Sequence, residues 1–301
     1  ATLPQKRRFD LIKAYLGKKD MDENADWCNT AGYPLFTWTD GEQVCQKLMS
    51  LGVEKDIIQV IWSKDEECMD ILKNSLKDGG CAGIILNTVA RAQDFAQKLS
   101  ECFPECEMIQ MHSQFIISDR AEIEREILKR AGKNSTPEQR NKLIIVGTQV
   151  LEQSLDIDFD VMITDLCPMD LLLQRIGREH RHKGRKRPLC LQKAKCYVLT
   201  ETRVVYDKWL LQRTADKLPE YFCLPDDIPV YVQDVYAEPN EDEKNDLWDE
   251  YMRHLEKLEE DAKRFRVGEP VCEEEDNPEF DSIKGWLNNT SAELTDAAAL
   301  A

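Results

Sequence analysis

The sequence has no apolar run long enough to cross a bilayer, and its first residues, ATLPQKRRFD, contain no apolar core of a signal peptide. We therefore expect neither a membrane-spanning helix nor a secretory leader. The sequence also starts without a methionine, so we expect it to be a piece of a longer protein. Its 301 residues suffice for one large domain or two smaller ones.

Residues that bind metals or form disulfides are poorly placed for either role. The closest cysteine pair, Cys102 and Cys106, has no nearby histidine or second cysteine pair to complete a zinc site. The eleven cysteines are odd in number and lie scattered within apolar, patterned segments. We therefore expect reduced, mostly buried thiols in a cytoplasmic protein, and no metal site.

Three motifs of nucleotide and nuclease chemistry are missing as well. The sequence has no Gly-x-x-x-x-Gly-Lys-Ser/Thr loop to cradle phosphates, no Asp-Glu-x-His sequence for Mg²⁺ and no paired His-Asp cluster. Its four histidines stand at positions 112, 180, 182 and 254. Without these parts, we expect the chain not to hydrolyse ATP at a useful rate by itself.

Charge is unevenly distributed along the chain. The formal net charge is -17, but residues 234–281 alone hold 19 acidic and 6 basic residues, a net of -13. The preceding part is nearly balanced and contains the basic block LLLQRIGREHRHKGRKRP, which starts at Leu171. A local patch of this kind can bind phosphates even in an acidic chain, so the overall charge does not exclude an anionic partner.

The apolar patterns alternate between strand and helix periods through the middle of the sequence. Continuous apolar strands that alternate with helices predict an α/β fold: a parallel sheet with helices on both faces. In such sheets, function gathers at the carboxyl ends of the strands. The expected strands are 33–39, 56–62, 81–88, 106–113, 142–148, 160–166 and 194–200, and the expected helices are 6–16, 65–80, 89–103, 118–132 and 171–177.

Two details refine this pattern. Ser118 is a plausible N-cap of its helix, and Gly132 stands at the end of the same helix. After residue 205 we expect a mainly helical extension: a helix over 206–220, a proline-bearing segment over 224–236 and a charged helix of about seven turns over 240–267. This long acidic helix is either a solvated connector or a contact to another domain or partner.

The basic block offers a chemistry for its arginines. Arg178 and Arg181 are three residues apart, so on a helix they share a face. Their guanidinium groups match phosphate oxygens and stay charged, and Gly177 lets a ligand or neighbouring backbone approach closely. This favours an arginine-finger role, in which arginine stabilises a phosphoryl group in transfer. A solvated basic helix end is the alternative, and we expect the following residues, 182–188, to form a solvated basic loop.

Two carboxylates precede the basic block. Asp156 and Asp158 stand in a loop before the next strand, where they could accept from a ribose hydroxyl or hold the arginines in place. Aspartate is also common in turns and caps for local reasons. We favour the simple turn role for Asp158 and a functional role for Asp156.

The sequence motifs together resemble a known family. QRIGREHR resembles motif VI of superfamily-2 helicases, GTQVLEQSLDID motif V, IILNTVARAQ motif IV, and ATLP the end of motif III. With HSQF and the arginine at 120, they are similar to the helicase–nuclease of type I CRISPR systems, which the Cascade surveillance complex recruits. The resemblance covers nearly the whole chain. It departs at Glu179, where the family usually has an apolar residue, and we expect this carboxylate to soften the basic patch.

The resemblance implies a RecA-like fold and a role for each matching position. Residues 1–30 would be the remnant of a first RecA-like domain, 31–205 the second RecA-like domain, and 206–301 a helical linker and acidic extension. Arg178 and Arg181 would be fingers on the ATP γ-phosphate, and Gln174, Arg175, Ser154 and Asp156 would lie near the nucleotide. The implied contacts to single-stranded DNA are Asn87, Thr88, Arg91, His112, Ser113, Arg120, Thr148 and Gln149.

The implied activity is ATP-driven movement along single-stranded DNA in antiviral defence. ATP and Mg²⁺ would be held mainly by a first RecA-like domain, and an HD nuclease domain and Cascade would be the other partners. Two other functions stay open: a stand-alone nucleic-acid-binding or regulatory module, and a translocase subunit of another superfamily-2 system.

Overall fold

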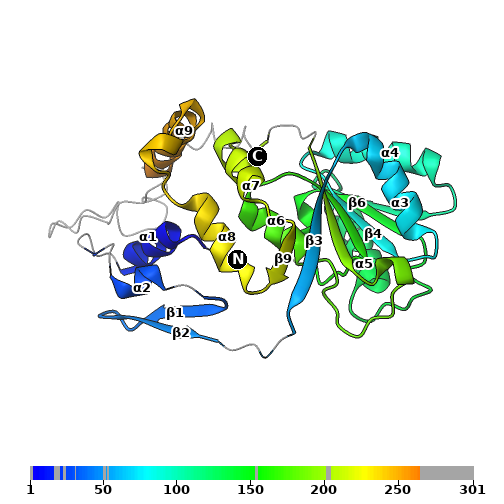
Figure 1. Cartoon of the computed structure of the whole chain (residues 1–301), viewed down its shortest axis with the longest axis horizontal. Helices are drawn as coiled ribbons and strands as arrows, with labels where there is room; N and C mark the ends of the chain where they lie inside the picture. Colours follow the sequence, from blue (N-terminus) through cyan, green and yellow to red (C-terminus); the bar gives the residue numbers. More distant parts are fainter. Residues whose placement is uncertain are drawn as a thin grey trace, which may run out of the picture. The chain divides into compact units, whose positions relative to one another are not determined.

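A twisted seven-stranded sheet is the main sheet of the described part of the chain (Figure 1). The computed structural model describes residues 3–16, 21–22, 25–30, 32–49, 52, 54–152, 155–200 and 205–264. The strand order is β5-β6-β4-β7-β8-β3-β9; all neighbours are parallel except β9, which runs antiparallel to β3. The strands are β3 (Asp56–Ser63), β4 (Cys81–Ile85), β5 (Glu107–Met111), β6 (Leu143–Gly147), β7 (Val161–Asp165), β8 (Ala194–Leu199) and β9 (Tyr221–Leu224).

Helices cover both faces of this sheet, as the sequence predicts. Successive strand residues point to opposite faces, so Ile84 and Ile85 belong to two different apolar cores. One core packs against α3 (Cys68–Leu76) and α4 (Val89–Cys102). The other packs against α5 (Ile117–Ala131), α6 (Met169–Ile176), α7 (Lys208–Lys217) and α8 (Asp227–Tyr236).

The N-terminal part holds a second, smaller sheet. Strand β1 (Leu35–Thr39), which the sequence predicts, pairs antiparallel with β2 (Val44–Leu48), which it does not. The hairpin closes at Asp40, whose side chain accepts from the backbone N–H of Glu42 at 2.9 Å, and Gly41 has a positive φ of 100°. Two helices, α1 (Gln5–Leu16) and α2 (Asp26–Asn29), precede this hairpin.

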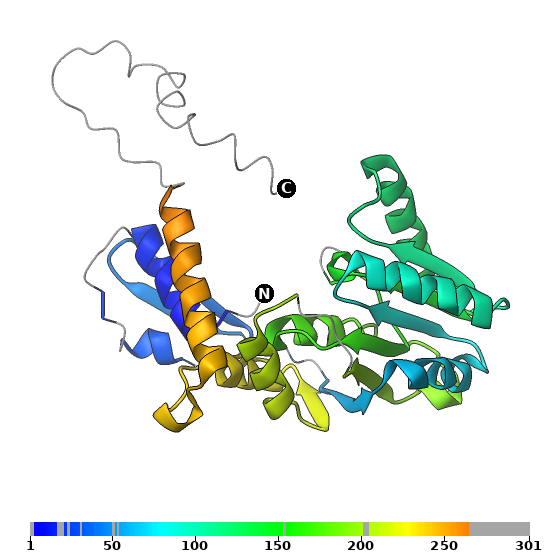
Figure 2. The same cartoon turned by 90° about the horizontal axis from the view of Figure 1, so that it is seen from above.

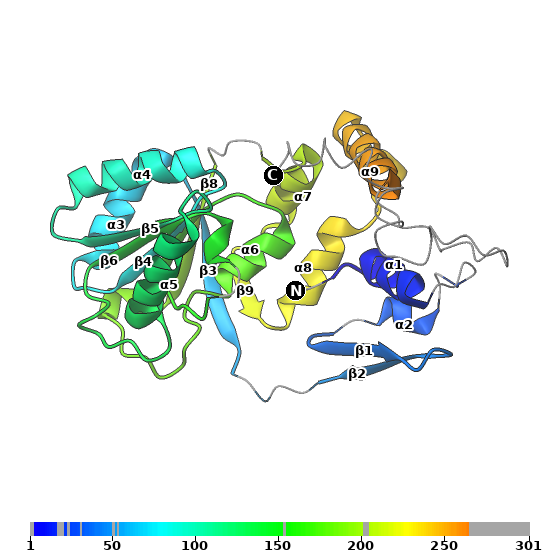
Figure 3. The ribbon, with the colours of Figure 1, turned by 180° about the vertical axis from the view of Figure 1, so that it is seen from behind.

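The part after residue 205 contributes to the main sheet. β9 lies beside β3 at the sheet edge (Figure 3), because its residues Tyr221–Leu224 pair with the first half of β3. Most of the proline-bearing segment forms α8, which lies entirely within residues 224–236. The charged helix α9 (Asp246–Arg264), orange in Figure 2, has 19 residues, fewer than predicted; Glu241–Glu243 form a separate short 3₁₀ turn, and residues after 264 lie outside the described part.

The two predicted boundaries of α5 have different outcomes. Gly132 is the C-cap, with its N–H donating to the carbonyl of Leu128, so this prediction is confirmed. Ser118 is not the N-cap: it lies inside the first turn, and Ile116 occupies the cap position. The Ser118 hydroxyl instead donates to Asp119 at 3.2 Å.

The cysteines form no disulfide in the described part of the chain. Half of the ten described cysteines are buried, and burial raises the pKa of Cys68 and Cys167 to about 12. Such thiols stay protonated and unreactive near neutral pH. Within the described residues, no helix is both long and apolar enough to pass through a membrane.

Candidate functional site

Three neighbouring strands end in polar residues that contact one another. Asn87 follows β4, Gln149 follows β6, and Asp165 ends β7. The backbone N–H of Asn87 donates to Asp165 at 2.8 Å, and the side-chain amide of Gln149 donates to the carbonyl oxygen of Asn87 at 3.0 Å. The carboxyl edge of the sheet thus brings together Asn87 and Gln149, two predicted site residues 62 positions apart in sequence, with Asp165, which is not among the predicted site residues.

Arg175 is the centre of this cluster and is fully buried. Its guanidinium donates to Glu152 at 2.7 Å, to the hydroxyl of Thr164 at 2.8 Å and to the side-chain oxygen of Asn87 at 3.1 Å. Glu152 is also buried, so the two opposite charges compensate each other away from water. The predicted contact of Arg175 with a nucleotide finds no support in this arrangement, because no part of the side chain reaches the surface.

The predicted DNA-contacting residues at the start of α4 are also engaged within the protein. Arg91 makes a two-point ion pair with Asp65, at 2.7 and 2.8 Å, and a further contact with Asp165 at 3.0 Å. Thr88 is the N-cap of α4, and its hydroxyl accepts from the backbone N–H of Arg91. A DNA phosphate that binds Arg91 has to displace Asp65.

The segment after β5 offers two exposed groups. His112 is buried and stacks on Phe115 with a ring-centroid distance of 4.3 Å, and burial lowers the pKa of this imidazole. Ser113 is exposed, and Arg120 is 43% exposed beside Glu124 on the first turns of α5. Of the three residues predicted here, Ser113 and Arg120 are therefore accessible to a ligand. Among the remaining predicted contacts, Thr148 is buried and Gln149 is half-buried.

The two candidate finger arginines lie just beyond α6. This helix ends at Ile176 with Gly177 as its C-cap, so the prediction that Arg178 and Arg181 share a helix face is wrong. The guanidinium of Arg178 donates to the carbonyl oxygens of Leu155 and of Glu152, the latter at 2.6 Å. Both arginines thus lie on a turn, not on a helix.

Arg181 is the more accessible of the two. Its side chain is 44% exposed and donates to Asp156 at 2.8 Å, and Asp156 is 52% exposed. Asp156 therefore does hold an arginine, one of the two functions that the sequence left open for it. The Arg181 partner lowers the pKa of Asp156 against the opposing effect of its desolvation.

Gly177 is the C-cap of α6. A Cβ at this position would meet only the carbonyl oxygens of Leu173 and Gln174, at 3.2 and 3.6 Å. No other described segment lies against this position, and the expectation that the glycine leaves room for a ligand or a facing domain stays a prediction. Gln174 is half-buried, and Ser154 lies outside the described residues.

The basic loop is not simply solvated. Arg185 and Arg187 are nearly buried, with 8% and 7% of their side chains exposed. Both form ion pairs with Asp158, which is fully buried, so Asp158 is more than a turn residue. The predictions of a solvated loop and of a simple turn role for Asp158 are wrong for the same reason. The positive charges of the loop and the negative charge of Asp158 compensate each other, although they are 27 or more residues apart in sequence.

Glu179 is buried and does not soften a basic patch. Its carboxyl group accepts from the backbone N–H of Lys195 at the start of β8. Desolvation raises the pKa of Glu179 well above its usual value, which favours the neutral carboxyl. The position is thus apolar in character, although its residue type differs from the family pattern.

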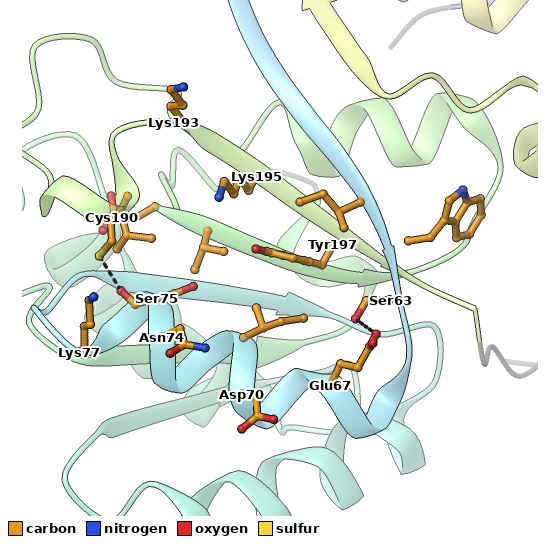
Figure 4. A pocket seen from close by; sticks show the side chains of 16 residues that line it. Ser63, Glu67, Asp70, Asn74, Ser75, Lys77, Cys190, Lys193, Lys195 and Tyr197 are labelled. Atoms are coloured by element: carbon orange, nitrogen blue, oxygen red, sulfur yellow. Dashed lines mark hydrogen bonds between the residues drawn. The ribbon is translucent and has the colours of Figure 1, made fainter.

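A separate hollow of about 660 Å³ opens between α3, β3 and β8 (Figure 4). Its walls carry both charge signs, with Glu67 and Asp70 on one side and Lys193 and Lys195 on the other. None of the residues predicted for ATP or DNA lines it. No group of three or more metal-ligating side chains is present among the residues that the structure describes.

Comparison with known proteins identifies the source of these motifs. The family model for the C-terminal part of the CRISPR-associated nuclease/helicase Cas3 matches residues 78–184. The CRISPR-associated nuclease/helicase Cas3 of Streptococcus thermophilus is 41% identical over 311 residues, which cover 96% of this chain and 33% of that protein. The matches cover between 22% and 34% of the length of the Streptococcus thermophilus protein and of three other curated relatives.

Solved structures agree with this match. The crystal structure of T. fusca Cas3 with AMPPNP superposes with a TM-score of 0.74 at 29% identity, covering 86% of this chain and 33% of that one. A chain of a CRISPR RNA-guided surveillance complex, in a pre-nicking state, gives 0.74 at 27% identity, covering 90% and 37%. By sequence and by fold, the chain is therefore a relative of the CRISPR-associated nuclease/helicase Cas3 and corresponds to the C-terminal part of the helicase.

Proposed function

We propose that the chain is the second RecA-like half of an ATP-dependent single-stranded-DNA translocase that acts in CRISPR antiviral defence. The observation that carries this proposal is the turn after α6. It presents Arg178 beside Glu152 and Arg181 beside Asp156, in a sequence that has no phosphate-cradling loop of its own. The names of the relatives and of the AMPPNP-bound neighbour support the same activity.

The donor set at this turn fits a phosphate group. Arg181 is half-exposed, and its ion-pair partner Asp156 is half-exposed too, so a phosphate oxygen can replace the carboxylate with little desolvation. Arg178 is held by two backbone carbonyls and keeps its position while the ligand binds. In this proposal Arg181 contacts the γ-phosphate and Arg178 supports the charge beside it.

The rest of the ATP site is contributed by another domain. ATP supplies the phosphoryl group that is transferred to water, and Mg²⁺ neutralises the charge on the phosphates. No group of three or more metal-ligating side chains is present among the described residues. In this proposal the other domain holds the metal and most of the phosphate oxygens. Closing and opening of two RecA-like domains around ATP would move the protein along DNA.

DNA contacts in this half are made to the backbone. Ser113 and Arg120 are accessible beyond the end of β5, whereas Asn87 and Arg91 are engaged within the protein. Binding through a few such groups is weakly sequence-specific and decreases as the salt concentration rises. The Cascade surveillance complex is one proposed partner, as the related surveillance-complex structure suggests. An HD nuclease domain is the other, which the family resemblance implies.

The isolated chain tests the half-site part of this proposal. We expect a pure sample of residues 1–301 to hydrolyse ATP no faster than buffer, with or without single-stranded DNA, because arginines alone do not hold the phosphates and the metal. Phosphate release measured over hours, with a full-length Cas3 relative as the positive control, checks this. Turnover that single-stranded DNA stimulates would show that the chain has a complete site.

A further inference from the structure

We propose that Arg187, with Arg185 and Arg140, forms an arginine clamp that positions the finger residue Arg181. The three arginines do so through ion pairs with Asp158 and Asp160. The proposal rests on the proposed function, because it gives the loop after the fingers a role in the same ATP site. These three arginines do not touch the ligand in this account. They are positioning residues that act through the backbone of Arg181.

The first step is the contact between Asp158 and the finger. One carboxylate oxygen of Asp158 accepts from the backbone N–H of Arg181 at 2.8 Å. The same carboxylate binds the guanidinium of Arg187 through two contacts, at 2.8 and 2.9 Å, and the Nε of Arg185 lies 2.5 Å away. The position of the Arg181 main chain therefore depends on a carboxylate that two arginines of the following loop hold in place.

The second step is the backbone pairing of the finger turn. The N–H of Phe159 donates to the carbonyl of Arg178 at 2.8 Å, and the N–H of His180 donates to the carbonyl of Phe159 at 3.1 Å. His180 has a positive φ of 49°, which is uncommon for a residue other than glycine and needs support from its surroundings. Asp158 and Phe159 provide that support on both sides of His180.

The third step connects the clamp to the rigid sheet. Asp160 accepts from the backbone N–H of Cys81, the first residue of β4, at 2.8 Å and from Arg140 at 2.8 Å. Arg187 contacts Asp160 as well as Asp158. Arg187 thus contacts both the carboxylate that holds the Arg181 backbone and the carboxylate at the start of the sheet, with Arg140 as a second, longer link at 3.9 Å from Asp158. The loss of Arg187 therefore loosens the connection between the turn and the sheet.

The clamp has more arginines than carboxylates, so one arginine can be replaced without leaving a buried carboxylate unpaired. Three guanidinium groups surround two carboxylates, so the replacement of Arg187 by alanine leaves Asp158 with Arg185 and Asp160 with Arg140. No carboxylate is left unpaired, and we expect the variant to fold. In the same loop, Lys186 is exposed, and Lys183 is 42% exposed and pairs with Asp56, outside the clamp. These two lysines are the matched controls.

The experiment is a double-mutant cycle in the full-length helicase that contains this chain. We expect Arg187→Ala to lower the DNA-stimulated kcat for ATP about 10- to 100-fold, while the KM for ATP and the affinity for single-stranded DNA stay within about twofold. Arg187→Ala combined with Arg181→Ala is expected to be no slower than Arg181→Ala alone, because both changes act on one group. Arg187→Lys is expected to restore part of the rate.

The outcomes separate this proposal from the function on which it rests. If the factors by which Arg187→Ala and Arg181→Ala lower kcat multiply in the double variant, the two changes act independently. Arg187 would then have a general structural effect, and the clamp proposal would be overturned. A kcat unchanged by Arg187→Ala, with weaker DNA binding in Lys183→Ala and Lys186→Ala, would make the loop a DNA contact and also overturn it. Full activity of Arg181→Ala would overturn the finger assignment itself, and the clamp with it.

Discussion

Glu179 illustrates how one side chain can be misjudged from its type. A carboxylate in a basic segment suggests charge compensation, yet this one is enclosed below the finger turn, with its second oxygen lacking a hydrogen-bond partner in the described structure. Burial raises its pKa, so the group contributes as a neutral hydrogen-bond acceptor to β8. The residue type is visible in the sequence, but its burial depends on the packing of α6 against β7 and β8.

The raised pKa of Glu179 predicts a pH dependence of stability. The folded state holds the proton more tightly than the unfolded state, so the stabilisation is fully present below the unfolded pKa of about 4.5 and is lost as the pH rises through the folded pKa. Relative to Glu179→Gln, the wild-type chain should lose about 1.4 kcal/mol of unfolding free energy per pH unit in that window. Urea unfolding at several pH values checks this, and parallel stability curves for the two proteins would contradict it.

At the scale of the elements, the sheet was largely predictable and the links between elements were not. Strands β3 to β8 and helices α3 to α6 follow from apolar runs and helical spacing, which are local signals. β2 and β9 were missed because each is short and depends on its partner strand. The Arg175–Asn87 contact joins residues 88 positions apart, so no local pattern predicts it.

Arg175 ties α6 to the ends of β4 and β7, so its loss should cost stability. We expect Arg175→Ala to lower the unfolding free energy by about 3–5 kcal/mol, because it leaves the buried Glu152 without its partner. Arg125→Ala, which removes an exposed pair with Glu122, is the control and should change stability by less than about 1 kcal/mol. The unfolding free energy of both variants is measured by urea unfolding. Similar losses for Arg175→Ala and Arg125→Ala would show that the buried contacts of Arg175 do not stabilise the fold.

At the scale of the whole molecule, the described part combines a seven-stranded sheet with a cluster of motif residues at its carboxyl edge. The motif residues at the carboxyl edge, predicted as ligand contacts, are mostly occupied with one another, whereas Ser113, Arg120 and Arg181 remain accessible. The structure divides the residues that the family resemblance implied into those that contact one another at the edge of the sheet and those that are accessible to a ligand, and their roles stay predictions. The domain boundaries at residues 30 and 205 remain predictions.

The most direct test of the central claim is the ATPase rate of Arg181→Ala in the full-length helicase. Arginine fingers contribute about 10³- to 10⁵-fold to phosphoryl transfer, so we expect a loss in this range with single-stranded-DNA affinity unchanged. Arg181→Lys keeps the charge but not the planar fork of donors, and should recover only part of the rate. Normal ATP turnover by Arg181→Ala, or a loss of DNA binding with turnover intact, would contradict the account.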